Sequence, residues 1–114
     1  MPPAKIIQLA QEATDRNRYN QALQYYQVIL ERYSHDIDLV MAAEYEIAFL
    51  HYKQKKYGEA KEEFTALLAR YNTTDAELLP PQYKILAEKV LPRIEEKLIQ
   101  KPEPALPSDY TPQI

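Results

Sequence analysis

The side chains of this sequence that could do chemistry are its histidines and its paired glutamates. His35 and His51 are the two histidines, and neither has further ligand-type residues at metal-binding spacing. His51 falls at an inner packing position of a predicted helix, so we interpret it as a hydrogen-bonded core residue. Glu62 and Glu63 are adjacent carboxylates of the kind that acid–base catalysis uses. They lie near the start of another predicted helix, where we interpret them as a solvated face.

The composition of the sequence argues against most other kinds of catalytic or ligand-binding site. The 114 residues include no cysteine and one glycine, which excludes thiol nucleophiles and disulfides and argues against a glycine-rich phosphate loop. No nucleophile–base pair or metal cluster is visible. The net charge of -3, with both signs interspersed, gives no positive field for a phosphate backbone. We therefore expect a protein that is not an enzyme, with no catalytic residues, no cofactor, no metal and no nucleic-acid partner.

The sequence leaves the cellular compartment open. No window approaches the run of about 18 apolar residues that a membrane span requires, so we expect no membrane insertion. The first residues, Met-Pro-Pro-Ala-Lys, lack the apolar segment of a secretory signal. A cytoplasmic location fits the sequence as written, and a periplasmic one fits if a leader has been removed.

Apolar periodicity predicts an all-α fold. Ten tyrosines and a single glycine suit helices joined by short links better than strands and tight turns. The pattern predicts two helices within residues 4–33, a third from Asp36 or Asp38 to about 54, a fourth from about 57 to 71, and a fifth from about 81 to 100. Asn17 or Asn20 is expected to cap the second helix. Pro92 is expected to kink or split the fifth. Residues 101–114 contain four prolines and are expected to form an extended or disordered tail.

An internal repeat is the most informative feature of the sequence. Residues 19–33 and 57–71 match at a constant offset of 38, which pairs Tyr19 with Tyr57 and Ala22 with Ala60. Repeats of 20–50 residues indicate stacked helical units, because one helical hairpin cannot bury its apolar face alone. Small residues at Ala10, Ala22, Ala48 and Ala60 would let paired helices approach closely, with Tyr26 and Phe64 filling the space beside them.

The repeated residues resemble the tetratricopeptide repeats. Residues 43–68 are similar to one complete repeat, with its signature positions held by Ile47, Ala48, Tyr57, Ala60 and Phe64. The first repeat fits at Leu9, Ala10, Tyr19, Ala22 and Tyr26, but Ala13 replaces the usual aromatic residue. The offset of 38 exceeds the family's 34 by about one helical turn, which we place at residues 37–40. Elongated repeats ending in Arg-Tyr also resemble those of bacterial envelope-assembly lipoproteins and Tol-Pal-associated periplasmic proteins.

The resemblance implies a domain and a binding surface. It implies a helical domain over residues 3–100, built as a right-handed stack of two antiparallel helix pairs, about 3–36 and 41–74. A capping helix at about 81–100 follows, and residues 101–114 form the Pro-rich tail. In this family the first helix of each repeat lines a groove that binds peptides. The groove-facing positions here would be Ala4, Ile7, Gln11, Thr14, Asp15, Ala42, Tyr45, Phe49, Tyr52 and Lys53.

Two interpretations of the aromatic residues remain open. Tyr45, Phe49 and Tyr52 fall at i, i+4 and i+7, and such a stripe suits an interaction surface. The stripe could instead be internal, covered by the fifth helix or by a second copy of the protein. The Pro-rich tail could also lie across it, from the same or a neighbouring chain. The sequence thus predicts a scaffold that binds a protein or peptide, with a self-associating assembly protein, buried through its stripe in a homo-oligomer, as the alternative.

Overall fold

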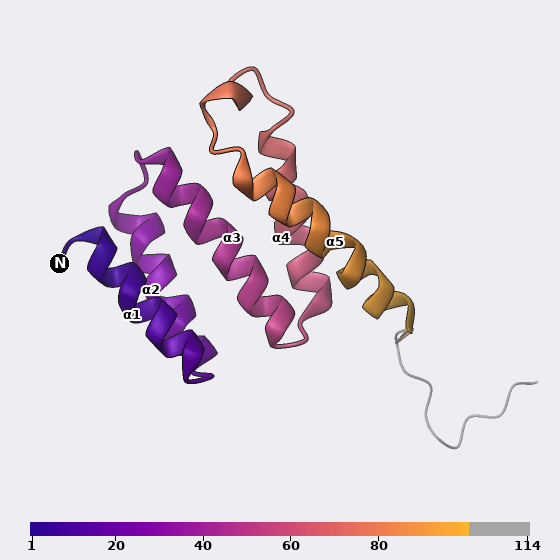
Figure 1. Cartoon of the computed structure of the whole chain (residues 1–114), viewed down its shortest axis with the longest axis horizontal. Helices are drawn as coiled ribbons and strands as arrows, with labels where there is room; N and C mark the ends of the chain where they lie inside the picture. Colours follow the sequence, from indigo (N-terminus) through magenta and orange to yellow (C-terminus); the bar gives the residue numbers. More distant parts are fainter. Residues whose placement is uncertain (101–114) are drawn as a thin grey trace, which may run out of the picture.

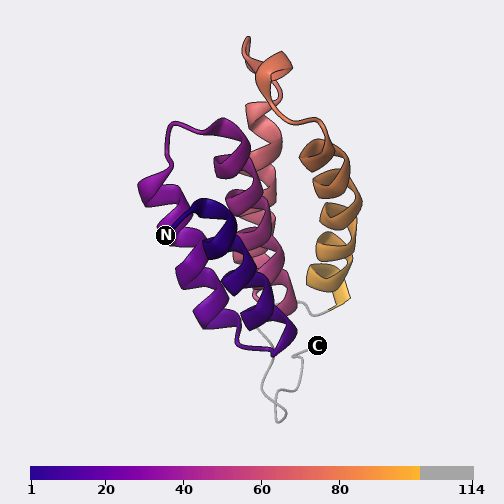
Figure 2. The ribbon, with the colours of Figure 1, turned by 60° about the vertical axis from the view of Figure 1, so that its left-hand side comes forward.

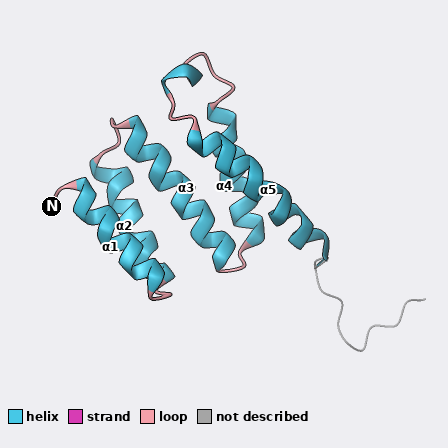
Figure 3. Cartoon of the chain, in the orientation of Figure 1, coloured by secondary structure: helices cyan, strands magenta, loops and turns pink. Residues whose placement is uncertain are grey.

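The computed structural model describes residues 1–100, which form five α-helices and one short 3₁₀ turn (Figure 1). The elements are α1 (Pro3–Asp15), α2 (Tyr19–Arg32), α3 (Ile37–Lys53), α4 (Tyr57–Arg70), η1 (Ala76–Leu78) and α5 (Gln82–Gln100). This described part contains helices and loops and no strand (Figure 3). The predicted all-α class is therefore confirmed. The prediction for the tail, residues 101–114, lies outside the described residues.

Helix α3 is the centre of the fold. Each α-helix packs against the next one along the chain, and α3 also contacts α5. Figure 1 shows α3 between the α1–α2 pair on one side and the α4–α5 pair on the other, and Figure 2 shows the same order from another side. A helix with neighbours on several sides must be apolar on several faces. Accordingly, α3 buries Val40, Met41, Ala43, Tyr45, Ile47, Ala48 and Leu50.

Two hydrophobic clusters share α3. The first joins α1 and α2 to Ala43, Ile47 and Leu50 of α3. The second joins α4 and α5 to Met41, Tyr45 and Ala48. Helix α5 therefore covers the α3–α4 pair as α3 covers the α1–α2 pair, with Ala87, Val90 and Ile94 as its buried residues. Each helix pair thus buries its apolar face against the helix that follows.

The turns within the two helix pairs have the same backbone geometry. Asn17, with φ 60°, and Lys55, with φ 64°, both adopt the left-handed conformation. Arg18 N donates to Ala13 O over 2.8 Å, and Lys56 N donates to His51 O over 2.8 Å. These positions differ by 38 residues, the offset of the sequence repeat. Both turns are Schellman motifs, which satisfy the last carbonyls of a helix. The sequence repeat is therefore also a repeat of backbone structure.

The small residues lie where the paired helices approach each other. Ala10, Ala22, Ala48 and Ala60 are all 0% exposed. Tyr26 and Phe64 are buried beside them at 3% and 0%. The packing role predicted for these residues is confirmed, since a larger side chain at any of the four alanines would separate the helices.

The helix ends follow the sequence predictions only in part. Asp36 caps α3, because its Oδ1 accepts a hydrogen bond from Leu39 N at 3.2 Å. The predicted asparagine cap of α2 is wrong: the N-cap residue is Arg18 and makes no side-chain cap bond. Asn17 instead occupies the left-handed position of the turn. Of the kink or split predicted at Pro92, the split is wrong, since α5 is continuous through this residue, and the kink stays a prediction.

Candidate functional site

Some of the residues predicted to bind a partner line a hollow between α1, α2, α3 and α5, which we call the central hollow. Its volume is about 190 Å³. It is lined by Ile7 and Gln11 of α1, Tyr26 and Ile29 of α2, Leu39, Ala42, Ala43 and Glu46 of α3, and Tyr83 of α5. Three residues predicted for a groove, Ile7, Gln11 and Ala42, thus line one cavity although they come from different repeats. Helix α3 brings them together by packing against α2, the partner of α1.

Glu46 is the charged residue of this lining. It is partly buried. Burial raises the pKa of its carboxyl above the ordinary value of 4.5, and the positive charge of Lys53 opposes that rise. Among residues 1–100, none of the hydrogen bonds or ion pairs involves Glu46. The hollow therefore presents an acceptor group without a partner in the described chain.

Tyr26 and Tyr83 line the hollow together with this carboxyl. Burial raises the pKa of Tyr26, Tyr45 and Tyr83, and the negative charge of Glu46 raises each of them further. All three phenols are therefore neutral at physiological pH. Neutral tyrosine rings present an electron-rich face on which a cation can lie. The local chemistry of the hollow is thus a carboxylate among aromatic rings.

Next to the hollow lies a row of aromatic rings that we call the aromatic ridge, formed by Tyr45, Phe49 and Tyr52 of α3. Tyr45 and Phe49 stack with ring centroids 6.0 Å apart, and Phe49 and Tyr52 lie 5.8 Å apart. Tyr83 of α5 meets one end, with its centroid 5.6 Å from Tyr45. Lys53 Nζ lies 5.5 Å from the centre of the Phe49 ring. The ridge is preorganised by contacts between its own rings.

The aromatic residues differ in how much surface they offer. Tyr45 is 7% exposed, because Phe64 of α4 and Tyr83 of α5 pack against it. Its role is mainly in packing, and this part of the stripe is internal and covered by α5. Phe49 and Tyr52 are half-buried, and Lys53 is exposed. Of the three stripe residues, Phe49 and Tyr52 therefore provide the accessible aromatic surface, and Tyr45 does not.

Sequence reasoning missed Glu46 and Tyr83. Glu46 lies four residues after Ala42 and three before Phe49, on the same helix face as these predicted groove residues. This position could have identified Glu46 from the sequence, since a carboxylate in the middle of an apolar helix is rarely buried without a partner. Tyr83 follows the long α4–α5 connection, and no local pattern fixes where such a helix docks.

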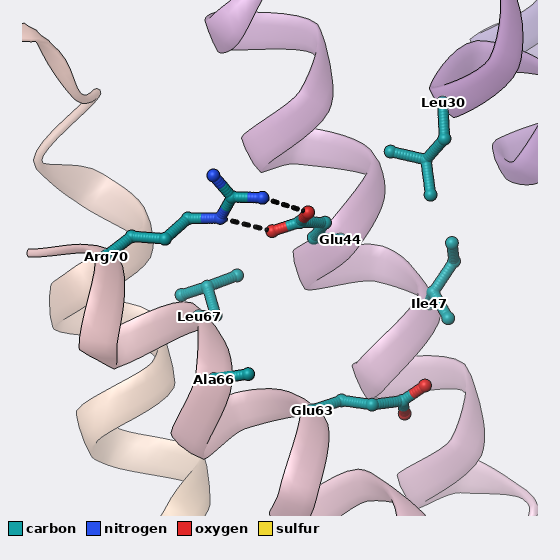
Figure 4. Close-up of a pocket in the computed structure, with 7 residues that line it drawn as sticks. All are labelled: Leu30, Glu44, Ile47, Glu63, Ala66, Leu67 and Arg70. Carbon is teal, nitrogen blue, oxygen red and sulfur yellow. Dashed lines mark hydrogen bonds and ion pairs between the residues drawn. The ribbon is translucent and has the colours of Figure 1, made fainter. Parts of the chain in front are cut away.

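A second hollow, which we call the Arg70 hollow, has a volume of about 450 Å³ (Figure 4). Leu30, Glu44, Ile47, Glu63, Ala66, Leu67 and Arg70 line it. Figure 4 shows the Arg70 side chain extended toward α3, where Nε donates to Glu44 Oε1 at 2.9 Å and Nη2 donates to Glu44 Oε2 at 2.6 Å. Arg70 and Glu44 satisfy each other, and Glu63, the third charged residue of the lining, contacts His51. The hollow therefore offers apolar surface beside a closed ion pair.

His51 and the glutamates of α4 form a separate polar contact. His51 Nδ1 lies 2.6 Å from Glu63 Oε1, and Nε2 lies 3.8 Å from Glu59 Oε2. Glu62 is exposed, and the Glu63 side chain is 35% exposed although it contacts His51. Among the described residues, no group of three or more histidine or acidic side chains could hold a metal ion. Within the same residues, no helix combines the length and apolarity needed to cross a bilayer.

Comparison with known proteins finds a relative in a bacterium. No family model matches the sequence, and no solved structure matches it. An uncharacterized protein of Treponema pallidum (strain Nichols) is 32% identical to this chain over 96 residues. The match covers 84% of this chain and 38% of that protein. The chain thus spans less than two fifths of the length of this relative.

Proposed function

We propose that this chain is a tetratricopeptide-type module that binds a peptide segment of another protein. The peptide would lie in the central hollow and continue over Phe49 and Tyr52 of the aromatic ridge. The observation that carries the proposal is the convergence of Ile7, Gln11 and Ala42 on one cavity, at positions expected to face the groove of such repeats.

The repeated geometry of the helix pairs supports the family assignment. The pairs α1–α2 and α3–α4 share their turn conformation and their buried alanines at an offset of 38 residues. In this proposal they are the two repeats, and α5 is the capping helix. Two repeats are fewer than a stacked repeat protein ordinarily needs, since at least three are required to bury a continuous core. The burial of Ala87, Val90 and Ile94 against the second pair supplies the missing neighbour.

The size and composition of the surface support a peptide as the ligand. Pockets for drug-sized molecules have volumes of about 300–1,000 Å³, and the central hollow, at about 190 Å³, suits a single inserted side chain. Phe49 and Tyr52 extend the apolar surface along α3 beyond the hollow. Aromatic side chains of this kind contribute strongly to binding because they bury a large area at low entropic cost.

The proposal can be tested by selection from a random dodecapeptide library displayed on phage, with the whole chain immobilised. We expect enriched peptides whose affinity, measured by titration calorimetry, falls at least tenfold in Ala42→Arg and in Phe49→Ala. Ala42→Arg fills the mouth of the hollow, and Phe49→Ala removes the centre of the ridge. Neither change removes a fully buried side chain.

The matched control is Ala66→Arg, which introduces the same side chain on α4 beside the Arg70 hollow. We expect it to bind the selected peptides as the unmodified chain does, with circular dichroism showing equal helicity in all variants. A library that yields no enriched peptide, or peptides that bind Ala42→Arg normally, would refute the proposal.

Self-association is the alternative function, favoured by the apolar residues exposed on α5. Ile85 is 54% exposed and Ile99 is 78% exposed. Tyr83 covers Tyr45 within one chain, whereas Phe49 and Tyr52 remain half-buried and are the part of the stripe that a second copy would cover. Light scattering at high protein concentration distinguishes the two functions: a dimeric mass that Ile85→Lys abolishes would support self-association, and a monomeric mass would exclude it.

A further inference from the structure

We propose that the central hollow selects peptides by a lysine or arginine side chain, which enters between Tyr26 and Tyr83 and forms an ion pair with Glu46. This inference rests on the proposed function and names the chemistry of its ligand. The peptide residues on either side of the basic one would lie on Phe49 and Tyr52.

Two glutamates of α3 carry the argument because they differ in their partners. Glu44 lies on the side of α3 that faces α4, where Arg70 holds both its oxygens at 2.9 and 2.6 Å. Glu46, two residues later, lines the central hollow and takes part in none of the ion pairs among residues 1–100. A partly buried carboxylate is costly when it lacks a counter-charge. A cation supplied by a ligand would provide that counter-charge.

The walls of the hollow suit the apolar stem and the charged head of a basic side chain. Ile7 and Ala42 can contact methylene groups, and the rings of Tyr26 and Tyr83 lie in the same lining. Aromatic rings stabilise a cation lying over their faces. Long basic side chains bury their stems on apolar surface while their heads reach a polar group. A neutral or acidic side chain would leave Glu46 unpaired and would therefore bind more weakly.

Lys53, whose positive charge acts on Glu46, forms no ion pair with it among residues 1–100. Lys53 lies seven residues after Glu46 on α3 and is exposed. Its Nζ lies over the Phe49 ring, 5.5 Å from the ring centre. It forms none of the ion pairs among residues 1–100. Lys53 therefore suits contact with an acidic residue or the carboxyl end of the same peptide, whereas Glu46 prefers a basic residue. The peptide would then run along α3, with its basic residue toward α5 and any acidic residue toward Lys53.

The ridge favours a peptide over a free amine. A small amine would fill the hollow but leave Phe49 and Tyr52 uncovered. A peptide gains contact area from both surfaces, since the register of Ala42, Glu46, Phe49 and Lys53 places all four on one face of α3. The occupant to which this inference commits is therefore a protein segment with a basic residue next to apolar ones.

The test uses the same dodecapeptide library with four forms of the whole chain. The unmodified chain should enrich peptides with one lysine or arginine at a constant position relative to apolar residues. Glu46→Gln should enrich apolar peptides without that preference, and Glu46→Lys should enrich an acidic residue instead. Glu44→Gln is the matched control on the same helix and should retain the basic preference.

A double substitution cycle then measures the contact itself. Replacing the basic residue of one selected peptide by methionine should weaken binding to the unmodified chain at least tenfold. The same peptide change should weaken binding to Glu46→Gln less than twofold. The peptide change alone keeps the test valid if Glu46→Gln folds poorly.

The possible outcomes separate this inference from the proposed function. Enriched peptides with no basic preference, or a preference that survives in Glu46→Gln, would overturn the inference and leave peptide binding intact. A library that yields no peptide would overturn both. Binding of butylamine alone as tightly as of the peptide would show a site for free amines and would also overturn the inference.

Discussion

Lys55 should lower the stability of this protein because its backbone adopts a conformation that suits glycine. Its φ is 64°, and it occupies the position after the α3 C-cap where glycine is most common. An L-residue with a Cβ pays roughly 1–2 kcal/mol for the left-handed conformation. Glycine removes that cost but loses about 0.5–1 kcal/mol through its greater freedom in the unfolded chain. Lys55→Gly should therefore stabilise the protein by about 0.5–1 kcal/mol.

The equivalent turn provides an internal comparison. Asn17 has a φ of 60°, but asparagine tolerates this region better than lysine does. Its Oδ1 also accepts a hydrogen bond from the Tyr19 hydroxyl at 3.0 Å, which glycine would remove. Asn17→Gly should therefore change the stability by less than about 0.5 kcal/mol. The two substitutions differ although their backbone geometry is the same.

Urea unfolding followed by circular dichroism at 222 nm measures both effects. Lys89→Gly, at an exposed position inside α5, is the control, and there glycine should cost about 1 kcal/mol. In thermal unfolding, 1 kcal/mol corresponds to a shift of about 4–8 °C for a domain of this size. If Lys55→Gly lowers the urea midpoint as Lys89→Gly does, the left-handed turn and the structural equivalence of the two helix pairs are refuted.

Three further predictions concern the core, the hollow and the surface ion pair. Phe64→Ala should destabilise the protein by about 3–5 kcal/mol, because Phe64 is 0% exposed; the urea midpoint measures this, and a loss below about 1 kcal/mol would contradict the second cluster. Glu46→Gln should be more stable than the unmodified chain at pH 7, because burial raises the pKa of Glu46 in the folded state; the unmodified chain then loses stability as the pH rises above 4.5. The urea midpoints of the two proteins should converge below that pH. A difference that stays constant with pH would contradict the raised pKa of Glu46 in the folded state. Arg70→Ala should cost no more than about 1 kcal/mol, because the Arg70 side chain is 42% exposed; a larger cost that persists in 1 M salt would show that the pair with Glu44 is not screened.

The repeat made much of the fold predictable from sequence. Tyr19 and Tyr57 begin the second helices of both pairs, as their matching positions indicated, and Asp36 caps α3 as predicted. These features depend on local chemistry or on spacing along the chain. The role of Asn17 was predicted wrongly because asparagine suits both a helix cap and a left-handed turn, and only the backbone geometry decides between them.

The site was less predictable because it depends on contacts between distant segments. The stripe of Tyr45, Phe49 and Tyr52 was visible as periodicity, but periodicity does not indicate which neighbour covers it. Tyr83, which lies 38 residues after Tyr45, buries one end of the stripe. The pairing of Arg70 with Glu44 spans 26 residues, so sequence patterns could not show which glutamate of α3 would remain without a partner.

The position of Tyr83 also bears on the role of α5. A helix that only caps a stack needs to bury apolar residues on its inner side and expose polar ones on the other. Helix α5 meets the first requirement with Ala87, Val90 and Ile94, yet its first turn also places Tyr83 in the wall of the central hollow. The hollow therefore requires α1, α2, α3 and α5 together, and neither helix pair could form it alone. If peptides bind there, loss of α5 should abolish binding even where the two pairs remain helical, because one wall of the site would be missing.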